Sequence, residues 1–272
     1  MYLRFLLVVF TLLSGFGPAY SQGVSTGAPY VIDVAMDKYP NATVWNKFGY
    51  NLDVDTGGNE VIASWGGTFT PPTTAETLKL VSTSAADSVT STGARGIVVY
   101  GVDENRVNQI EVVNLAGTDT VATTSEWLGI NRVAVYVAGT ALENVGTINL
   151  YTATGIQLAQ MPAGQGTTQQ AIFYTKDDHT FLPEWLYLNI NKIAQGGSPR
   201  VTIYGYVFSA VSNAKYEVYR STFDTAVENT IMLSIPVPFV VGENSVLWFE
   251  ANTNVDNTVV NIRFSGNEKQ NY

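Results

Sequence analysis

Residues 92–115 read TGARGIVVYGVDENRVNQIEVVNL, and this stretch decides the fold class. β-Branched and aromatic residues dominate the part before the polar centre at residues 103–106 and recur after it. Such residues suit the pleated, half-buried surface of a strand. Four polar residues between two such runs predict a hairpin loop. Because a lone hairpin is marginal in water, we expect the rest of the chain to supply strands that cover its apolar face.

The composition narrows the class of protein. The chain has 272 residues, which is enough for one large β domain or two ordinary ones. Hydrophobic residues make up 46% and charged residues 14%, which argues against disorder and against a long solvated helix. The net charge of −9 would repel a phosphate backbone, so we expect no nucleic-acid partner. The chain has no cysteine, which excludes a disulfide, a thiolate nucleophile and a cysteine zinc site.

The first 21 residues form a hydrophobic leader. Arg4 precedes an apolar run at residues 5–13, and small residues precede a cleavage point before Gln22. That pattern is typical of a secretory signal. Two other interpretations stay open: a short N-terminal anchor or packing helix, and a start of translation at Val24. The apolar run is too short to span a bilayer comfortably.

The strand rhythm predicts the domain organisation. Many short strands separated by turn signals favour sandwich or jelly-roll layers, and no long amphipathic helix is convincing. We therefore expect an all-β protein with two antiparallel β-sandwich or jelly-roll-like domains in tandem. The expected segments are the leader (1–21), an extended N-terminal arm (22–43), a first β-sandwich (44–160) and a second β-sandwich or jelly roll (161–272). The best linker candidate is the sequence PAGQG at residues 162–166.

Asp53 and Asp55 form the candidate metal site. A D-x-D start supplies two carboxylates of the kind that calcium requires. However, the twelfth position of such a loop is Ser64, where the motif needs a bidentate glutamate, and no flanking helices are evident. The competing interpretation is a turn in which aspartate side chains bond nearby backbone amides. We expect the turn, with no cofactor, and calcium is the alternative.

No residue pattern indicates catalysis, so we expect no enzyme. The only histidine, His179, follows Lys176-Asp177-Asp178, which is typical of a solvated turn, and no G-x-S-x-G elbow is present. Glutamates that a glycosidase would need in pairs are spread along the chain without a supporting motif. These are Glu60, Glu76, Glu111 and Glu184, each expected to face outward from a strand.

Five tryptophans are the candidates for stacking on sugars: Trp45, Trp65, Trp127, Trp185 and Trp248. In this composition we expect each of them to lie in a core or to cap a sheet edge. An exposed aromatic platform that binds glycans is the alternative.

A series of short motifs carries a family resemblance. The sequence WNKFGYNLDVDTG at 45–57 precedes WGGTF at 65–69, STSAAD at 82–87, TGAR at 92–95, VYGVD at 99–103 and GTI at 146–148. Their order and spacing resemble a family of structural proteins of tailed bacteriophages, often from aquatic hosts, encoded among the virion genes. The resemblance runs from about Tyr30 through most of the chain, and residues 1–21 lie outside it.

The resemblance implies a non-enzymatic component of the virion. Such a protein decorates the capsid, forms part of a head fibre or belongs to the tail, and packs against other virion proteins. The family has no catalytic residues to carry over. Five motif glycines are expected to have positive φ or a close backbone approach, namely Gly49, Gly57, Gly67, Gly93 and Gly101.

Two expectations about partners follow. Exposed strand edges favour a homo-oligomer, with a trimer or a capsid-bound array as the favoured form. The expected localisation is the virion. If residues 1–21 are a cleaved signal, the alternative is a secreted or cell-surface β-sandwich binding module, with host-surface glycans as its ligands.

Overall fold

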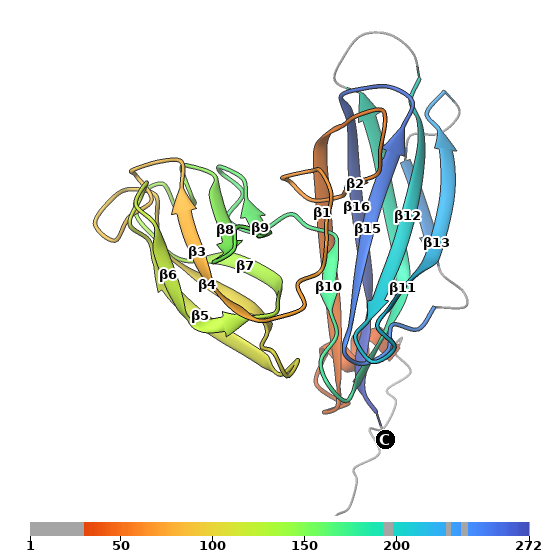
Figure 1. Ribbon diagram of the computed structural model, residues 1–272, viewed down its shortest axis with the longest axis horizontal. Coiled ribbons are helices and arrows are strands. Elements are labelled where there is room, and N and C mark those ends of the chain that lie inside the picture. Colours follow the sequence, from red (N-terminus) through yellow and green to blue (C-terminus); the bar gives the residue numbers. More distant parts are fainter. Residues whose placement is uncertain (1–29, 193–197, 227–229, 235–238, 272) are drawn as a thin grey trace, which may run out of the picture.

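The computed structural model describes residues 30–192, 198–226, 230–234 and 239–271. Within these residues the chain forms strands and one short helix, and the paired strands are antiparallel. The expected all-β, antiparallel sandwich class is therefore confirmed. Figure 1 shows a sandwich with short strands beside a sandwich with long strands. The predicted leader at 1–21 lies outside the described residues.

The larger sandwich has two sheets. The β1 sheet has the order β1-β16-β11-β14, and the β15 sheet has the order β10-β15-β12-β13, with the short strand β2 paired to β15. The strands are β1 (Ala42–Val54), β2 (Glu60–Val61), β10 (Ile172–Tyr174), β11 (His179–Lys192), β12 (Arg200–Ser209), β13 (Ala214–Asp224), β14 (Thr230–Ser234), β15 (Ser245–Thr253) and β16 (Thr258–Gln270).

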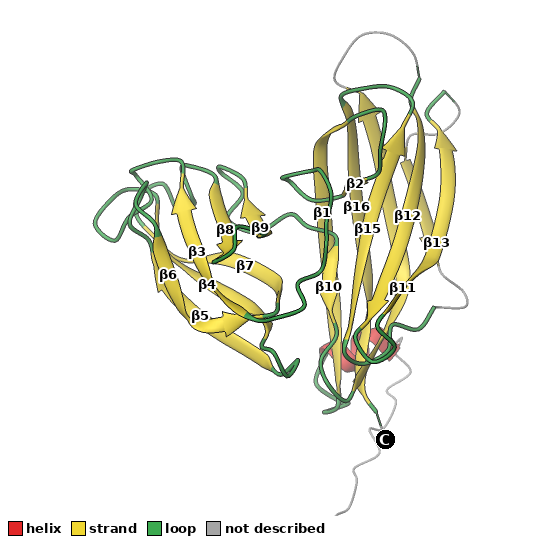
Figure 2. Ribbon diagram, in the orientation of Figure 1, coloured by secondary structure: helices red, strands yellow, loops and turns green. Residues whose placement is uncertain are grey.

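The strand order of the larger sandwich is that of a jelly roll. If the short strand β2 is left aside, the larger sandwich has eight strands in chain order, with β1 as the first and β10 to β16 as the second to the eighth. In that count the β1 sheet joins the first, eighth, third and sixth strands, and the β15 sheet joins the second, seventh, fourth and fifth. Two interlocking Greek keys in two facing sheets define an eight-stranded jelly roll. Figure 2 shows the two layers of long strands.

The smaller sandwich consists of two shorter sheets, with the orders β6-β3-β8-β9 and β5-β4-β7. Its strands are β3 (Glu76–Ser82), β4 (Ala94–Val102), β5 (Asn108–Asn114), β6 (Val121–Trp127), β7 (Gly129–Ala138), β8 (Ile148–Thr152) and β9 (Gln157–Met161). The hairpin predicted at residues 92–115 is β4 and β5, which pair from Gly96↔Asn114 to Val102↔Asn108. Strand β4 lies at the centre of its sheet, and this explains its long apolar run.

The pairing corrects the expected domain boundaries. Strand β1, assigned to a first sandwich at 44–160, pairs along most of its length with β16 near the C-terminal end. The smaller sandwich, from β3 to β9, is thus inserted between the first and second strands of the jelly roll. The predicted linker at 162–166 does begin where β9 ends. Local patterns mark where strands are, but they do not reveal a pairing between segments about 200 residues apart in sequence.

The expected extended arm at 22–43 also needs correction. Its described part contains helix α1 (Tyr30–Ala35) and a turn before β1. Val34 on this helix is buried, and Lys38 forms an ion pair with Asp33 at 2.8 Å. Burial of Val34 and this ion pair hold the segment in a compact form instead of an extended one. Among the described residues, no helix has the length and apolar character needed to cross a membrane.

In the part of the chain that the structure describes, three apolar clusters hold the molecule together. One fills the space between the two sheets of the jelly roll, and a second fills the smaller sandwich. The third joins the two sandwiches, because Val102 and Leu128 of the smaller one pack with Ile172, Tyr174 and Trp248 of the larger one. Strand β15 is buried on both faces, which explains its unbroken apolar run at residues 246–249.

The expectation for the five glycines is confirmed. Gly57 and Gly67 have positive φ, whereas Gly49, Gly93 and Gly101 lie where a Cβ would collide with neighbouring atoms. At Gly49 an added Cβ would come within 2.4 Å of the backbone oxygen of Ile62. This close approach lets β1 pass against the chain segment that leads into the smaller sandwich.

Candidate functional site

Asn131 fastens the smaller sandwich to an edge of the jelly roll. Its side chain lies on β7, is buried, donates to the backbone oxygen of Tyr174 at 3.0 Å and accepts from the backbone nitrogen of Tyr174 at 2.8 Å. Strand β10, which carries Tyr174, is at the edge of its sheet. The amide of Asn131 therefore satisfies backbone groups that the edge strand leaves unpaired.

Arg106 makes a second connection between the sandwiches. Sequence reasoning placed it in a polar hairpin loop, but it is buried and has a positive φ of 59°. Its Nη1 donates to the backbone oxygen of Ser245 at 3.2 Å, and its guanidinium lies 5.6 Å from the centre of the Tyr174 ring. Burial lowers the pKa of Arg106 and raises the pKa of Tyr174. The tip of the hairpin thus docks the two sandwiches.

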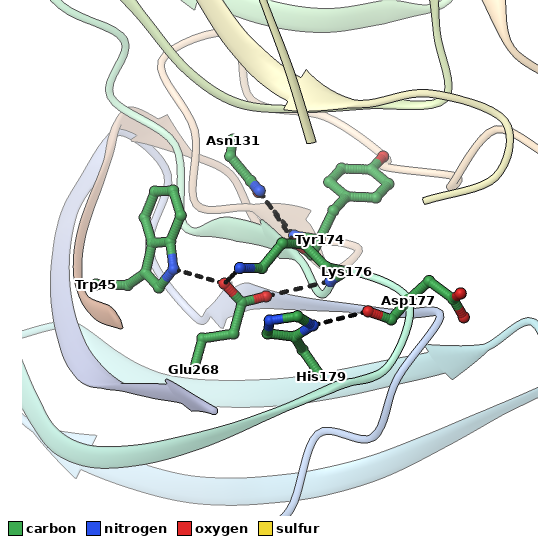
Figure 3. A network of polar contacts seen from close by, with 7 residues as sticks. All are labelled: Trp45, Asn131, Tyr174, Lys176, Asp177, His179 and Glu268. Carbon is green, nitrogen blue, oxygen red and sulfur yellow. Dashed lines mark hydrogen bonds and ion pairs between the residues drawn. The ribbon is translucent and has the colours of Figure 1, made fainter. Parts of the chain in front are cut away.

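Glu268 organises the polar network drawn in Figure 3. This buried carboxylate accepts from Trp45 Nε1 at 2.9 Å and from the backbone nitrogen of Lys176 at 3.1 Å, and it forms an ion pair with Lys176 Nζ at 3.2 Å. Both of its oxygens are therefore occupied by groups of the fold. The network fixes the turn before β11 against β1 and β16.

A groove with three cations lies where β1, β7 and β16 meet, and we call it the basic groove. Its cations are Lys47, Arg132 and Arg263. It has a volume of about 520 Å³ and is also lined by Thr43, Val44, Trp45, Asn46, Phe48, Asn131, Thr167, Thr168 and Gln170. The lining residues come from both sandwiches, so the groove exists only because the smaller sandwich docks beside β1.

Lys47 is the unusual member of the basic groove. Its side chain is 6% exposed, and its Nζ donates to the backbone oxygen of Asn131. No carboxylate among the described residues forms an ion pair with it. Burial, together with the nearby charge of Arg132, lowers the pKa of Lys47 from 10.5 to about 7. Burial of an ammonium group without an opposite charge is costly, so this position is not optimised for stability.

A line of four aromatic side chains, two exposed and two partly buried, runs beside the groove, and we call it the aromatic row. It consists of Phe48 and Tyr50 on β1 and Trp185 and Tyr187 on β11. Arg263 on β16 pairs with both Phe48 and Tyr187, which places these three residues on one face of the β1 sheet. Trp185 is 47% exposed and Phe48 is 42% exposed.

The aromatic row and the basic groove form one continuous surface. A second hollow of about 530 Å³ is lined by Trp185, Leu186, Tyr187 and Ser265, together with Asn46, Phe48 and Arg263. The last three residues also line the basic groove. Aromatic faces suit the apolar faces of sugar rings, and guanidinium and ammonium groups suit carboxylates. The combined surface is therefore equipped to bind a ligand that has both features.

Sequence reasoning missed this surface, although one signal of it exists. Trp45, Lys47 and Gly49 alternate along β1 in phase with the inward-facing positions. A lysine at such a position departs from the pattern of a half-buried strand. Arg132 and Arg263 carry no comparable signal, because they are exposed residues of other strands.

The predicted calcium residues lie at the end of β1, with Asp53 inside the strand and Asp55 directly after it. Asp53 and Asp55 are exposed, and Asp55 Oδ1 accepts from the backbone nitrogen of Asn257 at 3.3 Å. No group of three or more potential metal ligands occurs in the described part of the chain. The backbone nitrogens of Asp55 and Gly67 donate to the carboxylate of Glu60 and not to an aspartate side chain.

The candidate catalytic residues have structural partners. His179 Nδ1 lies 2.7 Å from the backbone oxygen of Asp177. Glu76 accepts from Thr154, Glu111 accepts from the backbone nitrogens of Thr124 and Ser125, and Glu184 accepts from Asn267. These contacts bind strands and loops together, and the glutamates belong to different elements.

The tryptophans divide by environment. Trp127 and Trp248 are buried, and Trp45 and Trp65 are partly buried and pack against cores, as expected. Trp185 differs, because nearly half of its side chain is exposed beside the basic groove. The sequence alternative of an exposed aromatic platform therefore applies to this residue.

Three of the sequence motifs, STSAAD at 82–87, TGAR at 92–95 and GTI at 146–148, meet at Asp87. Its buried carboxylate accepts from Ser82 Oγ at 2.6 Å, from the backbone nitrogens of Ala94 and Val145 at 2.9 Å, and from that of Gly146 at 2.8 Å. Gly93 stands so close that an added Cβ would lie 2.2 Å from Asp87 Oδ1. Three separated motifs thus form one structural node of the smaller sandwich.

Comparisons with known proteins identify no family. No protein-family model matches this chain, and no curated protein matches it. One solved structure, described as T=1 particles derived from infectious bursal virus, aligns with 85% of this chain and 78% of its own chain. It has 9% sequence identity and a TM-score of 0.10, a level of similarity that carries no argument.

Proposed function

We propose that this protein is a non-enzymatic structural component of a tailed-phage particle, in which it decorates the capsid or forms part of a head fibre or tail. The observation that carries the proposal is the jelly-roll strand order of the larger sandwich. Jelly rolls recur in viral capsid proteins and in lectin domains. Because one fold hosts several functions, the strand order supports the proposal together with the motif resemblance.

The site geometry also supports a role in packing. The polar clusters around Glu268 and Asp87 are occupied by groups of the fold, and they brace loops and strand edges. The resemblance motifs that meet at Asp87 are structural, as expected for a family whose members share an architecture. Such a protein works by presenting rigid surfaces to other virion proteins.

Formation of a homo-oligomer is part of the proposal. The outer face of the sheet β5-β4-β7 carries exposed apolar side chains, with Ile110 65% exposed, Val112 48% exposed and Tyr136 61% exposed. Strand β5 is also the edge strand of this sheet among the described residues. Apolar groups on the outer face of an edge strand suit the packing of a second copy of the chain.

The proposal is tested by the composition of purified particles. Particles are banded in a density gradient, and peptides are identified by mass spectrometry. The expected result is that peptides of this chain rise and fall with those of the major capsid protein across the gradient. If they remain in the soluble or envelope fractions while capsid peptides band, the structural role is wrong.

A second candidate function is glycan binding by a secreted or cell-surface module, and the aromatic row favours it. Sugar rings stack on aromatic side chains that present a flat, solvent-facing surface. A glycan screen with the purified protein and with Trp185→Ala tests this function. Binding that is lost in the variant supports it, and absence of binding to any glycan contradicts it.

A further inference from the structure

The basic groove concentrates positive charge in an acidic protein. The chain has a net charge of −9, yet three cations and no aspartate or glutamate line the groove among the described residues. Arg132 and Arg263 reach it from different sandwiches, and Lys47 lies at its base on β1. A cleft of one sign attracts ligands of the opposite sign even when the whole protein carries the same sign as the ligand.

The buried ammonium of Lys47 lacks a partner that matches its charge. An ammonium group has three donors, and the acceptor given by the described residues is the neutral backbone oxygen of Asn131. A methionine would fill the same volume without the desolvation cost. Lys47 is therefore better explained by a bound anion than by the stability of the fold.

The aromatic row restricts the kind of anion. Phe48 and Trp185 form an exposed apolar floor next to Arg263, and the exposed side chain of Asn46 lines the same surface. A small inorganic anion would use the cations and leave the aromatic row uncovered. A chain of sugar rings with carboxylates would use both parts of the surface.

We propose that the basic groove and the aromatic row together bind an acidic oligosaccharide of the uronate class. Carboxylates of the sugar contact Lys47, Arg132 and Arg263, and pyranose rings stack on Phe48 and Trp185. This inference rests on the second candidate function, glycan binding. It adds the class of ligand and the residues that recognise the negative charge of that ligand. It is also compatible with a particle protein that contacts a host surface.

The test compares ligands that differ only in charge. The probes are oligogalacturonate and oligoalginate, each with its methyl-esterified form as a neutral match, and binding to the full chain is measured by isothermal titration calorimetry. The acid form is expected to bind about tenfold or more tightly than its ester, since each ion pair that is lost costs about that factor. Added salt should weaken binding of the acid form only.

Three variants and a control test which residues bind the ligand. Lys47→Met and Arg263→Gln should each weaken binding of the acid form about tenfold and leave ester binding unchanged. Trp185→Ala should weaken binding of both forms, because stacking does not depend on the carboxylate. Lys79→Met, which removes an exposed lysine of the smaller sandwich, is the matched control and should bind like the wild type.

Each outcome separates the inference from the function on which it rests. Acid-selective binding that needs Lys47 and Arg263 supports the inference. Equal binding of acid and ester, or unchanged acid binding in both cation variants, overturns the inference and leaves glycan binding standing. If neither form binds and a wide glycan screen is also negative, both are overturned. Circular dichroism of each variant checks that it is folded.

Discussion

Replacing Lys47 by methionine is expected to stabilise the protein at neutral pH. The side chain is 6% exposed, and its pKa is lowered from 10.5 to about 7, chiefly by burial. A shift of that size corresponds to about 5 kcal/mol of differential free energy, because one pKa unit is worth about 1.4 kcal/mol. Methionine removes this cost and also loses the hydrogen bond to Asn131, worth about 1 kcal/mol. The expected net gain at neutral pH is about 2–4 kcal/mol.

The same pKa shift fixes how wild-type stability depends on pH. Between about pH 7 and about pH 10.5 the unfolded chain holds a proton on Lys47 that the folded chain has released, so unfolding takes up a proton. Stability contributed by this residue therefore rises with pH in that window. From about pH 6 to about pH 9 the gain is about 2–3 kcal/mol.

Urea unfolding followed by fluorescence, at several pH values across that range, measures both effects. The free energy of unfolding should rise with pH in the wild type and stay nearly flat in Lys47→Met. Lys79→Met, which removes an exposed lysine, should follow the wild type within about 0.5 kcal/mol. A wild-type curve that is flat or falls over this range, or a Lys47→Met variant less stable than the wild type at neutral pH, would refute the reasoning.

Three further predictions concern the fold and the assembly. Asp87→Asn should lower the free energy of unfolding by about 2–4 kcal/mol, because the new amide NH₂ would face buried backbone donors. Urea unfolding measures this change, with Asp119→Asn as an exposed control. An effect of Asp87→Asn no larger than that of the control would contradict the prediction. Asn131→Ala should lower the free energy of unfolding by about 2–4 kcal/mol, because it leaves the backbone groups of Tyr174 unpaired. Urea unfolding measures this change as well. An unchanged free energy of unfolding would show that Asn131 does not fasten the two sandwiches. Ile110→Asp should lower the mass of the homo-oligomer measured by analytical ultracentrifugation and leave the subunit folded, because it places a charge on the outer face of the sheet β5-β4-β7. An unchanged mass would exclude this face as the contact between subunits.

The local architecture was predictable from sequence. The hairpin at residues 92–115 and the turn at residues 177–178 depend on short-range alternation and on turn residues, and both are where the patterns place them. The glycine expectations succeeded for the same reason, since a close backbone approach or a positive φ requires glycine whatever surrounds it.

The long-range organisation was not predictable. Nothing in residues 42–54 indicates that they pair with β16, and this pairing makes the smaller sandwich an insertion. Arg106 was expected in a polar hairpin loop, and docking of the sandwiches buries it there. Strand register and docking depend on contacts between distant segments, which single-sequence patterns do not carry.

The candidate site was the least predictable part. The basic groove needs residues from β1, β7 and β16, and it forms only when the two sandwiches meet. The residues that sequence reasoning singled out, Asp53, Asp55 and His179, lie elsewhere. Asp55 accepts from the backbone nitrogen of Asn257, and His179 Nδ1 lies close to the backbone oxygen of Asp177. Only the lysine at an inward-facing position of β1 hinted at the surface.

The most direct test of the central claim is a cryo-electron microscopy reconstruction of the intact particle from the native source. The claim is that this chain is a structural component of a phage particle. We expect density at repeated, symmetry-related positions that accommodates the jelly roll together with its inserted sandwich. A well-resolved particle in which no density fits this pair of sandwiches, and whose protein content lacks this chain, would contradict the claim.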